Sequence, residues 1–127
     1  MKKEENFTLN ARIESFRFAF RGLASLFKNE HNSRIHLLAA AAVIILGAIL
    51  GITRFEWCVI VLVIGFVFTA ELINTSLESL ADIVHPDISD AIRQAKDYSA
   101  AAVLIAAIVS VVAGCLIFIP RILELMK

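Results

Sequence analysis

Four polar side chains recur at helical spacing just after a long apolar stretch. They are Glu71, Asn74, Glu78 and Asp82. At about 100° per residue they point nearly the same way on an α-helix, and the apolar residues 55–68 before them are typical of a membrane-embedded helix. A carboxylate at membrane depth costs roughly 2.5 kcal/mol or more. A site that binds a metal ion or accepts a proton would explain that cost.

The composition is that of a membrane protein. Of the 127 residues, 59% are hydrophobic, and the mean hydropathy is +0.80, which is more apolar than an ordinary soluble domain. We expect one membrane-embedded domain over residues 1–127. Cys58 and Cys115 lie in apolar runs and are expected to act as small hydrophobes. The first apolar run begins near Ile35, too late for a signal peptide, so we expect a mature chain.

The predicted fold class is an all-α membrane protein with three transmembrane helices and an N-terminal amphipathic surface helix. In residues 10–30, Asn10 can cap a helix in which Phe and other apolar residues recur at helical spacing between basic flanks. This pattern favours a helix lying on the membrane surface, and it also fits a helix packed within a bundle. The three spans are predicted at about 35–52, 55–82 and 97–119.

The predicted connections contain the residues that usually end and begin helices. Gly47 and Gly51 in the first span have the spacing of a small-residue helix contact. Pro86 is expected to end the second span, and Asp87 or Ser89 can cap the helix that follows.

The distribution of positive charge predicts the orientation in the membrane. Seven Lys or Arg side chains precede the first span, whereas the first loop carries only Arg54 and the second carries Arg93 and Lys96. The positive-inside rule therefore places the N-terminus and the second loop in the cytoplasm. The polar face of 55–82 would then approach the cytoplasmic surface, where ATP is available. Arg121, near the C-terminus, is in mild conflict with this orientation.

Further polar residues are expected at the same membrane boundary. Glu30 and Arg34 precede the first span, and Lys96 and Asp97 stand at the start of the third. Carboxylates with an amide oxygen suit Mg²⁺ accompanied by water and phosphate, while Lys and Arg suit phosphate oxygens. The sequence lacks G-x-x-x-x-G-K-[ST] and G-x-G-x-x-G, which argues against a soluble-type nucleotide-binding domain. The three histidines lack a metal-ligand spacing and are expected to be solvated or hydrogen-bonded.

The sequence also resembles a known family. The run ELINTSLESLAD at 71–82 closely resembles the signature E-hydrophobic-x-N-[ST]-[SA]-hydrophobic-E-x-x-x-D of the prokaryotic diacylglycerol kinase and undecaprenol kinase family. Ala95-Lys96-Asp97 resembles the second motif of that family. Asn29-Glu30, followed by Arg34, resembles the third. The resemblance extends over about residues 12–120.

This resemblance implies a small lipid kinase of the bacterial inner membrane that assembles as a homotrimer, with its N-terminus and active site on the cytoplasmic side. The implied reaction transfers the γ-phosphate of MgATP to a membrane lipid alcohol. Glu71 would be the general base, and Glu30 and Glu78 would bind Mg²⁺. The implied nucleotide-binding residues are Glu30, Glu78, Asp82, Lys96 and Asp97, and the implied substrate-positioning residues are Asn74, Arg34 and Lys96. The expected partners are ATP, the lipid alcohol and the bilayer, and no nucleic acid.

Three short runs bear on which lipid is phosphorylated. The R-I-H run at 34–36, the Ala-rich run after Ser99 and the I-F-I-P run at 117–120 are similar to the undecaprenol kinases of the family. Tyr98-Ser99 matches neither group of the family. The sequence therefore favours undecaprenol, with diacylglycerol as the alternative.

Two functions of other classes stay open from the residues alone. Intramembrane acids also mark the ion or proton paths of transporters, but here they are predicted in one half of the bilayer only. Asn74 and the nearby Ser and Thr side chains could instead join helices in a structural assembly, for which two Glu side chains are not needed. The lipid kinase is the favoured function.

Overall fold

The computed structural model describes residues 8–84 and 89–127, which form four α-helices and no strand. The helices are α1 (Leu9–Asn29), α2 (His31–Leu50), α3 (Arg54–Val84) and α4 (Asp90–Leu125). The last three are long and apolar enough to span a membrane. The predicted class, an all-α membrane protein with three spans after an N-terminal amphipathic helix, is confirmed.

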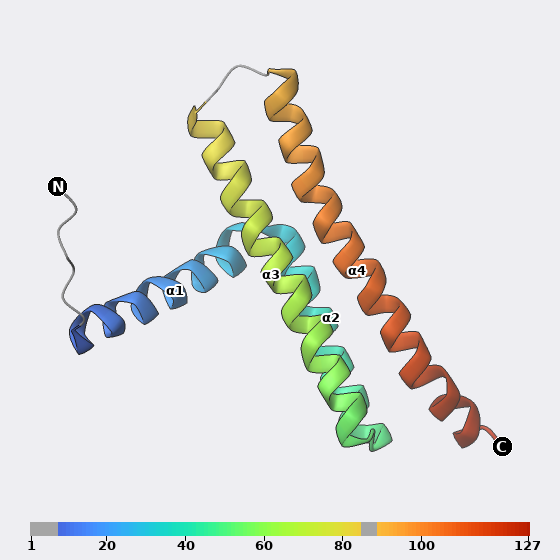
Figure 1. Ribbon diagram of the computed structural model, residues 1–127. Coiled ribbons are helices and arrows are strands. Elements are labelled where there is room, and N and C mark those ends of the chain that lie inside the picture. Colours follow the sequence, from blue (N-terminus) through green and yellow to red (C-terminus); the bar gives the residue numbers. More distant parts are fainter. Residues whose placement is uncertain (1–7, 85–88) are drawn as a thin grey trace.

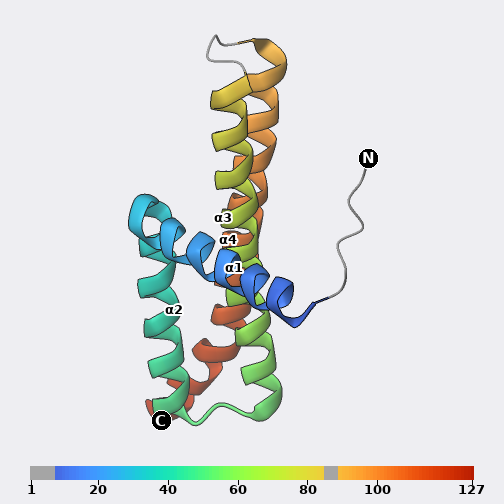
Figure 2. The same cartoon turned by 90° about the vertical axis from the view of Figure 1, so that its left-hand side faces the viewer.

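The helices form a bundle from which α1 departs at a steep angle (Figures 1 and 2). α3 and α4 run antiparallel and share most of the contacts between helices, and α2 packs beside α3. α1 contacts both α2 and α3, and the α3–α4 hairpin continues beyond the level of α1. A membrane surface parallel to α1 would therefore leave the end of this hairpin in water.

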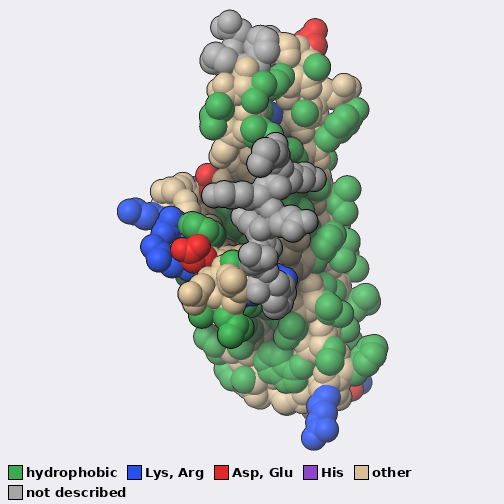
Figure 3. All heavy atoms as spheres, turned by 60° about the vertical axis from the view of Figure 1, so that its left-hand side comes forward, with side chains coloured by type: hydrophobic (Ala, Val, Ile, Leu, Met, Phe, Trp, Pro, Cys, Tyr) green, Lys and Arg blue, Asp and Glu red, His purple; other side chains and the backbone are tan. Residues whose placement is uncertain are grey.

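Most of the molecular surface is apolar. Large hydrophobic side chains are exposed along all three long helices, among them Leu38, Leu62 and Leu116, each at least 70% exposed. Figure 3 shows Lys and Arg side chains gathered beside the level of α1, above a surface that is mostly hydrophobic. Such a surface suits contact with lipid or with other subunits rather than with water.

α1 begins slightly earlier than the sequence predicts. Its N-cap is Thr8 rather than Asn10, because the Thr8 hydroxyl accepts a hydrogen bond from the backbone N–H of Ala11 at 3.4 Å. α1 and α2 are separated by Glu30 alone, whose extended backbone (φ −97°, ψ 118°) turns the chain from the surface helix into the first span.

The turn from α2 to α3 depends on two glycines. Gly51 ends α2 in the left-handed conformation, with φ at 61°, which glycine adopts at little cost. Gly47 is buried, and a Cβ at this position would lie 3.0 Å from the side chains of both Ile52 and Trp57. Each glycine of the predicted small-residue pair therefore has a structural role within the chain.

The helix boundaries around the second loop follow the same capping chemistry. Ser89 caps α4, because its hydroxyl accepts a hydrogen bond from the N–H of Ile92 at 3.3 Å. Pro86 and Asp87, the predicted stop and the alternative cap, lie outside the described residues. α4 continues through Pro120 to Leu125, beyond the predicted end of the third span at about 119.

The end of the bundle opposite the α3–α4 loop is held by apolar packing and by one ion pair. Arg121 Nη2 of α4 lies 2.6 Å from Glu56 Oε2 of α3, and both side chains are about three-quarters buried. Glu56 also accepts hydrogen bonds from the backbone N–H and the hydroxyl of Thr53. The charge of Arg121 is thus balanced within the chain. The buried cluster at this end comprises Ile52, Ile60, Ile117 and Phe118.

Candidate active site

Glu71 is a carboxylate in the interior of the bundle, only 3% exposed. It shares the buried face of α3 with Ile60 and Val67, because offsets of eleven and four residues return to the same side of a helix. His36 of α2 lies against it, with Nε2 at 3.1 Å from Glu71 Oε1. The contact lacks hydrogen-bond geometry, so Oε1 has no hydrogen-bond partner in the described part of the chain.

One turn further along α3, a chain of hydrogen bonds orients a second carboxylate. Asn74 donates its amide Nδ2 to Glu78 Oε1 at 3.1 Å, and its Oδ1 accepts the Ser99 hydroxyl of α4 at 2.7 Å. A carboxylate can only accept, so the amide nitrogen must face Glu78 and the amide oxygen must face Ser99. Ser99 is 7% exposed and also lies 2.9 Å from the carbonyl oxygen of Lys96. This buried hydroxyl therefore fixes the amide that orients Glu78.

Towards the end of the α3–α4 hairpin, the polar face carries an ion pair. Lys96 Nζ lies 2.8 Å from Asp82 Oδ1, and Lys96 also lies within electrostatic range of Glu78. Asp97, the next residue of α4, is exposed. Exposure rises along the polar face of α3, from buried Glu71 through half-buried Glu78 to exposed Asp82. The face thus leads from the bundle interior to the outside.

Glu30 approaches the same region from the junction of α1 and α2. It is half-buried and lines a pocket of about 340 Å³ between α1 and α3. Hydroxyl and amide side chains also line this pocket, namely Ser25, Asn29, Thr75, Ser76 and Ser79.

The Arg34 side chain binds the C-terminus of α1. Its guanidinium donates hydrogen bonds to the carbonyl oxygens of Phe27, at 2.9 Å, and of Lys28. These carbonyls have no partner within the helix, so Arg34 serves as a cap for α1 in this structure. Its predicted role in positioning the substrate stays a prediction.

The structure brings the three predicted glutamates into one electrostatic environment. The charges of Glu30 and Glu78 both act on Glu71. Within residues 8–84 and 89–127, no group of three or more His, Cys, Asp or Glu side chains is placed to hold a metal ion. Mg²⁺ bound with a nucleotide keeps waters and phosphates and needs only one or two carboxylates. The donor types of Glu30 and Glu78 fit that requirement.

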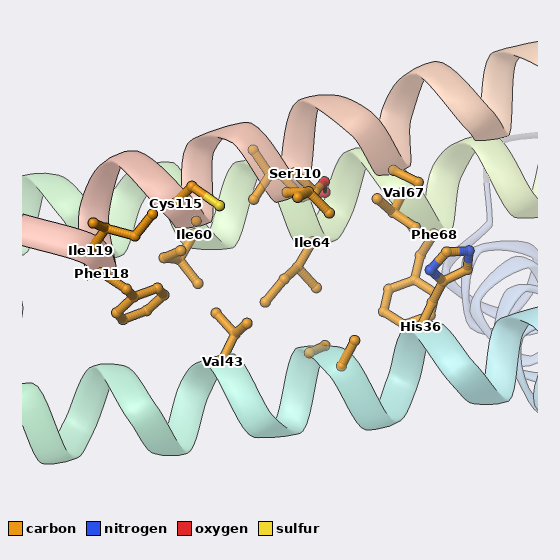
Figure 4. A pocket seen from close by; sticks show the side chains of 16 residues that line it. His36, Val43, Ile60, Ile64, Val67, Phe68, Ser110, Cys115, Phe118 and Ile119 are labelled. Atoms are coloured by element: carbon orange, nitrogen blue, oxygen red, sulfur yellow. Dashed lines mark hydrogen bonds between the residues drawn. The ribbon is translucent and has the colours of Figure 1, made fainter. Parts of the chain in front are cut away.

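An apolar cavity of about 420 Å³ lies between α2, α3 and α4. Figure 4 shows His36 and Phe68 at one end of this cavity and Phe118 and Ile119 at the other. Its lining is otherwise hydrophobic or glycine, apart from Ser110. The cavity therefore ends at the imidazole that contacts Glu71.

The sequence predicts no role in the site for two neighbours of the polar face of α3. His36 contacts Glu71, and Ser99 orients Asn74. Each comes from a different helix than its partner, so the spacing of residues along the chain does not reveal the contact. The one available signal is that both are polar residues at the polar end of an apolar span.

Comparison with known proteins identifies the family. The family model of the prokaryotic diacylglycerol kinase matches residues 17–118. The undecaprenol kinase of Bacillus subtilis is 36% identical over 119 residues, covering 94% of this chain and 97% of that protein. The diacylglycerol kinase of Synechocystis sp. is 37% identical over 115 residues (90% of this chain, 66% of that protein), and that of Haemophilus influenzae is 33% identical over 107 residues (84% and 91%). The chain therefore belongs to the prokaryotic diacylglycerol kinase family and is a lipid kinase.

Proposed function

We propose that this chain transfers the γ-phosphate of MgATP to the hydroxyl group of a membrane lipid alcohol, with undecaprenol as the preferred acceptor. The observation that carries the proposal is the placement of Glu71, which is 3% exposed and touches the His36 ring at the end of the apolar cavity. On its other side, the polar face of α3 leads to the exposed end of the hairpin. A lipid hydroxyl and a nucleotide phosphate can meet at such a point from opposite sides.

Glu71 is the proposed general base. It accepts the proton of the lipid hydroxyl while the hydroxyl oxygen attacks the γ-phosphorus of ATP. The new O–P bond forms as the bond between the γ-phosphorus and the bridging oxygen of ADP breaks, and ADP leaves with the electron pair. Positioned proton transfer of this kind contributes about 10²- to 10⁴-fold to a rate. The rest of the acceleration comes from placement and from neutralising phosphate charge.

The groups proposed to hold the nucleotide surround Glu71. Glu30 and Glu78 are the proposed ligands of Mg²⁺, which supplies charge neutralisation at the phosphates when it is bound. Asn74 keeps one oxygen of Glu78 engaged, which supports a fixed orientation of that carboxylate. Lys96 is proposed to contact phosphate oxygens, and its ion pair with Asp82 restrains the ammonium group.

The remaining predicted residues are proposed to act in the same site. Asp97 is exposed beside Lys96 and is proposed to contact the nucleotide. Asn74, Lys96 and Arg34 are proposed to position the substrates. For Arg34 this requires that its hydrogen bonds to the end of α1 are exchanged or shared when substrate binds.

The preference for undecaprenol has two supports. The R-I-H run at 34–36 is similar to undecaprenol kinases, and the similar protein of Bacillus subtilis bears that name and matches over 94% of this chain. Two of the other similar proteins are named diacylglycerol kinase, so diacylglycerol is the second candidate acceptor.

Assembly and location complete the proposal. We place residues 1–127, as one domain, in the bacterial inner membrane, with the N-terminus and the active site on the cytoplasmic side. The excess of basic residues before α2 supports this orientation. A homotrimer is proposed from the family resemblance, and the exposed apolar faces of the three long helices are suited to subunit contacts.

A side-by-side assay of the two lipids tests the proposed function. The purified protein, in mixed micelles with equal mole fractions of undecaprenol or dioleoylglycerol, is given MgATP labelled at the γ-phosphate, and the labelled lipid is measured. We expect both kcat/KM and maximal rate to be higher for undecaprenol. A higher value for dioleoylglycerol would reverse the assignment of the acceptor, and labelling of neither lipid by a protein that binds MgATP would refute the function.

A further inference from the structure

We propose that His36 is the positioning residue for Glu71. Its Nε2 would hold Oε1 of the carboxylate, which leaves the other oxygen, Oε2, to accept the proton of the lipid hydroxyl. The proposal rests on the proposed role of Glu71 as general base. It adds a second residue of α2, besides Arg34, to a site otherwise built from α3, α4 and the α1–α2 junction.

The contact between these two side chains joins a buried acid to a partly accessible ring. His36 Nε2 and Glu71 Oε1 are 3.1 Å apart, and the side chains are 23% and 4% exposed, respectively. Oε1 has no hydrogen bond in the described part of the chain. A buried carboxylate oxygen without a donor is costly, and the imidazole is already at donor distance. The proposal requires the ring to rotate about its side-chain bonds so that its Nε2–H points at Oε1.

The negative charges near Glu71 make a hydrogen-bond donor to its carboxylate favourable. The charges of Glu30 and Glu78 both act on Glu71, and both repel a carboxylate. None of the residues that line the cavity on α4 is charged. The His36 ring, 3.1 Å from Glu71 Oε1, can offset this repulsion while fixing the direction of the carboxylate.

The place of His36 in the cavity links the base to the proposed path of the lipid. Figure 4 shows the His36 ring at one end of the cavity, beside Phe68. Phe68 is itself packed edge-on against Phe27 of α1, with ring centroids 5.4 Å apart. A hydroxyl that arrives along this apolar wall meets the imidazole, whose Nε2 lies 3.1 Å from Glu71 Oε1. Proton transfer requires the lipid hydroxyl oxygen and the accepting carboxylate oxygen to lie within hydrogen-bond distance of each other. A flexible Glu side chain meets this requirement when a second group orients it.

A purely structural role for His36 makes the opposite prediction for two substitutions. If the ring only fills space in an apolar cavity, His36→Leu should be tolerated better than His36→Gln. If the ring orients Glu71, His36→Gln should be the better substitute, because its amide N–H can reach Oε1 and leucine has no donor. The comparison therefore separates packing from positioning.

The test measures kcat, the KM for MgATP and thermal unfolding for both variants in the full chain. Matched controls are His31→Leu and His31→Gln, since His31 is an exposed histidine five residues earlier on α2. We expect His36→Leu to lower kcat by about 10- to 100-fold, the loss of one contact to a charged group, with the KM for MgATP within about twofold. His36→Gln should recover most of that loss, and both His31 variants should match the wild type.

A second measurement does not depend on turnover. In protein labelled with ¹⁵N at histidine, Glu71→Gln should shift the imidazole resonances of His36 and leave those of His31 unchanged. Unshifted His36 resonances would overturn the proposal, as would a His36→Leu variant with wild-type kcat or a His36→Gln variant no better than leucine. The Glu71 and His36 variants together distinguish a failure of the proposed base from a failure of the positioning role. Wild-type turnover by Glu71→Gln would refute the proposed base, whereas a dead Glu71→Gln with fully active His36 variants would refute only the positioning role.

Discussion

Replacing Asn74 with leucine should weaken the use of MgATP while the helices stay intact. The change keeps the branching and the number of side-chain heavy atoms but removes the donor that holds Glu78 Oε1 at 3.1 Å. A hydrogen bond to a charged group contributes about 1.5–3 kcal/mol. Because Asn74 and Glu78 are both half-buried, we expect the lower end of this range, which corresponds to about a tenfold higher KM for MgATP.

Losing the hydrogen bond between Asn74 Oδ1 and the Ser99 hydroxyl should have a small effect. Ser99 loses Asn74 Oδ1 as an acceptor but keeps the carbonyl oxygen of Lys96 at 2.9 Å. The variant Ser99→Ala leaves Asn74 and Glu78 in place and removes one neutral hydrogen bond, of about 0.5–1.5 kcal/mol. Its KM for MgATP should therefore rise by about two- to tenfold, no more than that of Asn74→Leu.

A variant that combines both substitutions tests whether Ser99 acts on Glu78 through Asn74. Ser99 acts on Glu78 only through Asn74, so Asn74→Leu with Ser99→Ala should behave like Asn74→Leu alone. The assay is initial rate against MgATP concentration at saturating lipid, with circular dichroism to confirm that helix content is retained. If the effects of the two substitutions simply add, or if Asn74→Leu stays within twofold of the wild type, the hydrogen-bond chain does not position Glu78.

Two further predictions follow from the carboxylates of α3. Glu78→Ala should raise the Mg²⁺ concentration needed for half-maximal rate, because one proposed ligand is gone; an unchanged Mg²⁺ titration would remove Glu78 from the metal site. Arg121→Met should lower stability, because it breaks the 2.6 Å contact with Glu56. Thermal unfolding in detergent measures this loss, kcat at low temperature should be unchanged, and a variant as stable as the wild type would contradict it.

The pattern of apolar residues was sufficient to predict the four helices, but not their ends. Hydropathy predicts the first span at 35–52, whereas α2 begins at His31. It predicts the third span at 97–119, whereas α4 begins at Asp90, where one of the two expected caps, Ser89, already indicated an earlier start. The difference arises because a helix satisfies its own backbone hydrogen bonds and continues into polar residues, where a hydropathy signal stops. The prolonged helix matters for the site, since Lys96 and Ser99 are both positioned by the regular turns of α4.

The sequence predicts the part of the candidate site that lies on one helix, but not the contacts between helices. Residues on one helix can be placed by the 3.6-residue period, so Glu71, Asn74 and Glu78 were expected on one face, and the structure has Asn74 bonded to Glu78. Contacts between helices depend on how far one helix is shifted along another. His36 and Ser99 are separated from their partners by 35 and 25 residues, and no period in the sequence encodes those contacts.

The central claim is that the buried carboxylate of Glu71 accepts the proton of the lipid alcohol. The most direct measurement is the kcat of Glu71→Gln with saturating lipid and MgATP, alongside its affinity for MgATP in the absence of turnover. The amide keeps the shape of the side chain but cannot act as a base, so we expect kcat to fall by about 10²- to 10⁴-fold with nucleotide affinity and oligomeric state retained. A variant that phosphorylates lipid at the wild-type rate would contradict the claim.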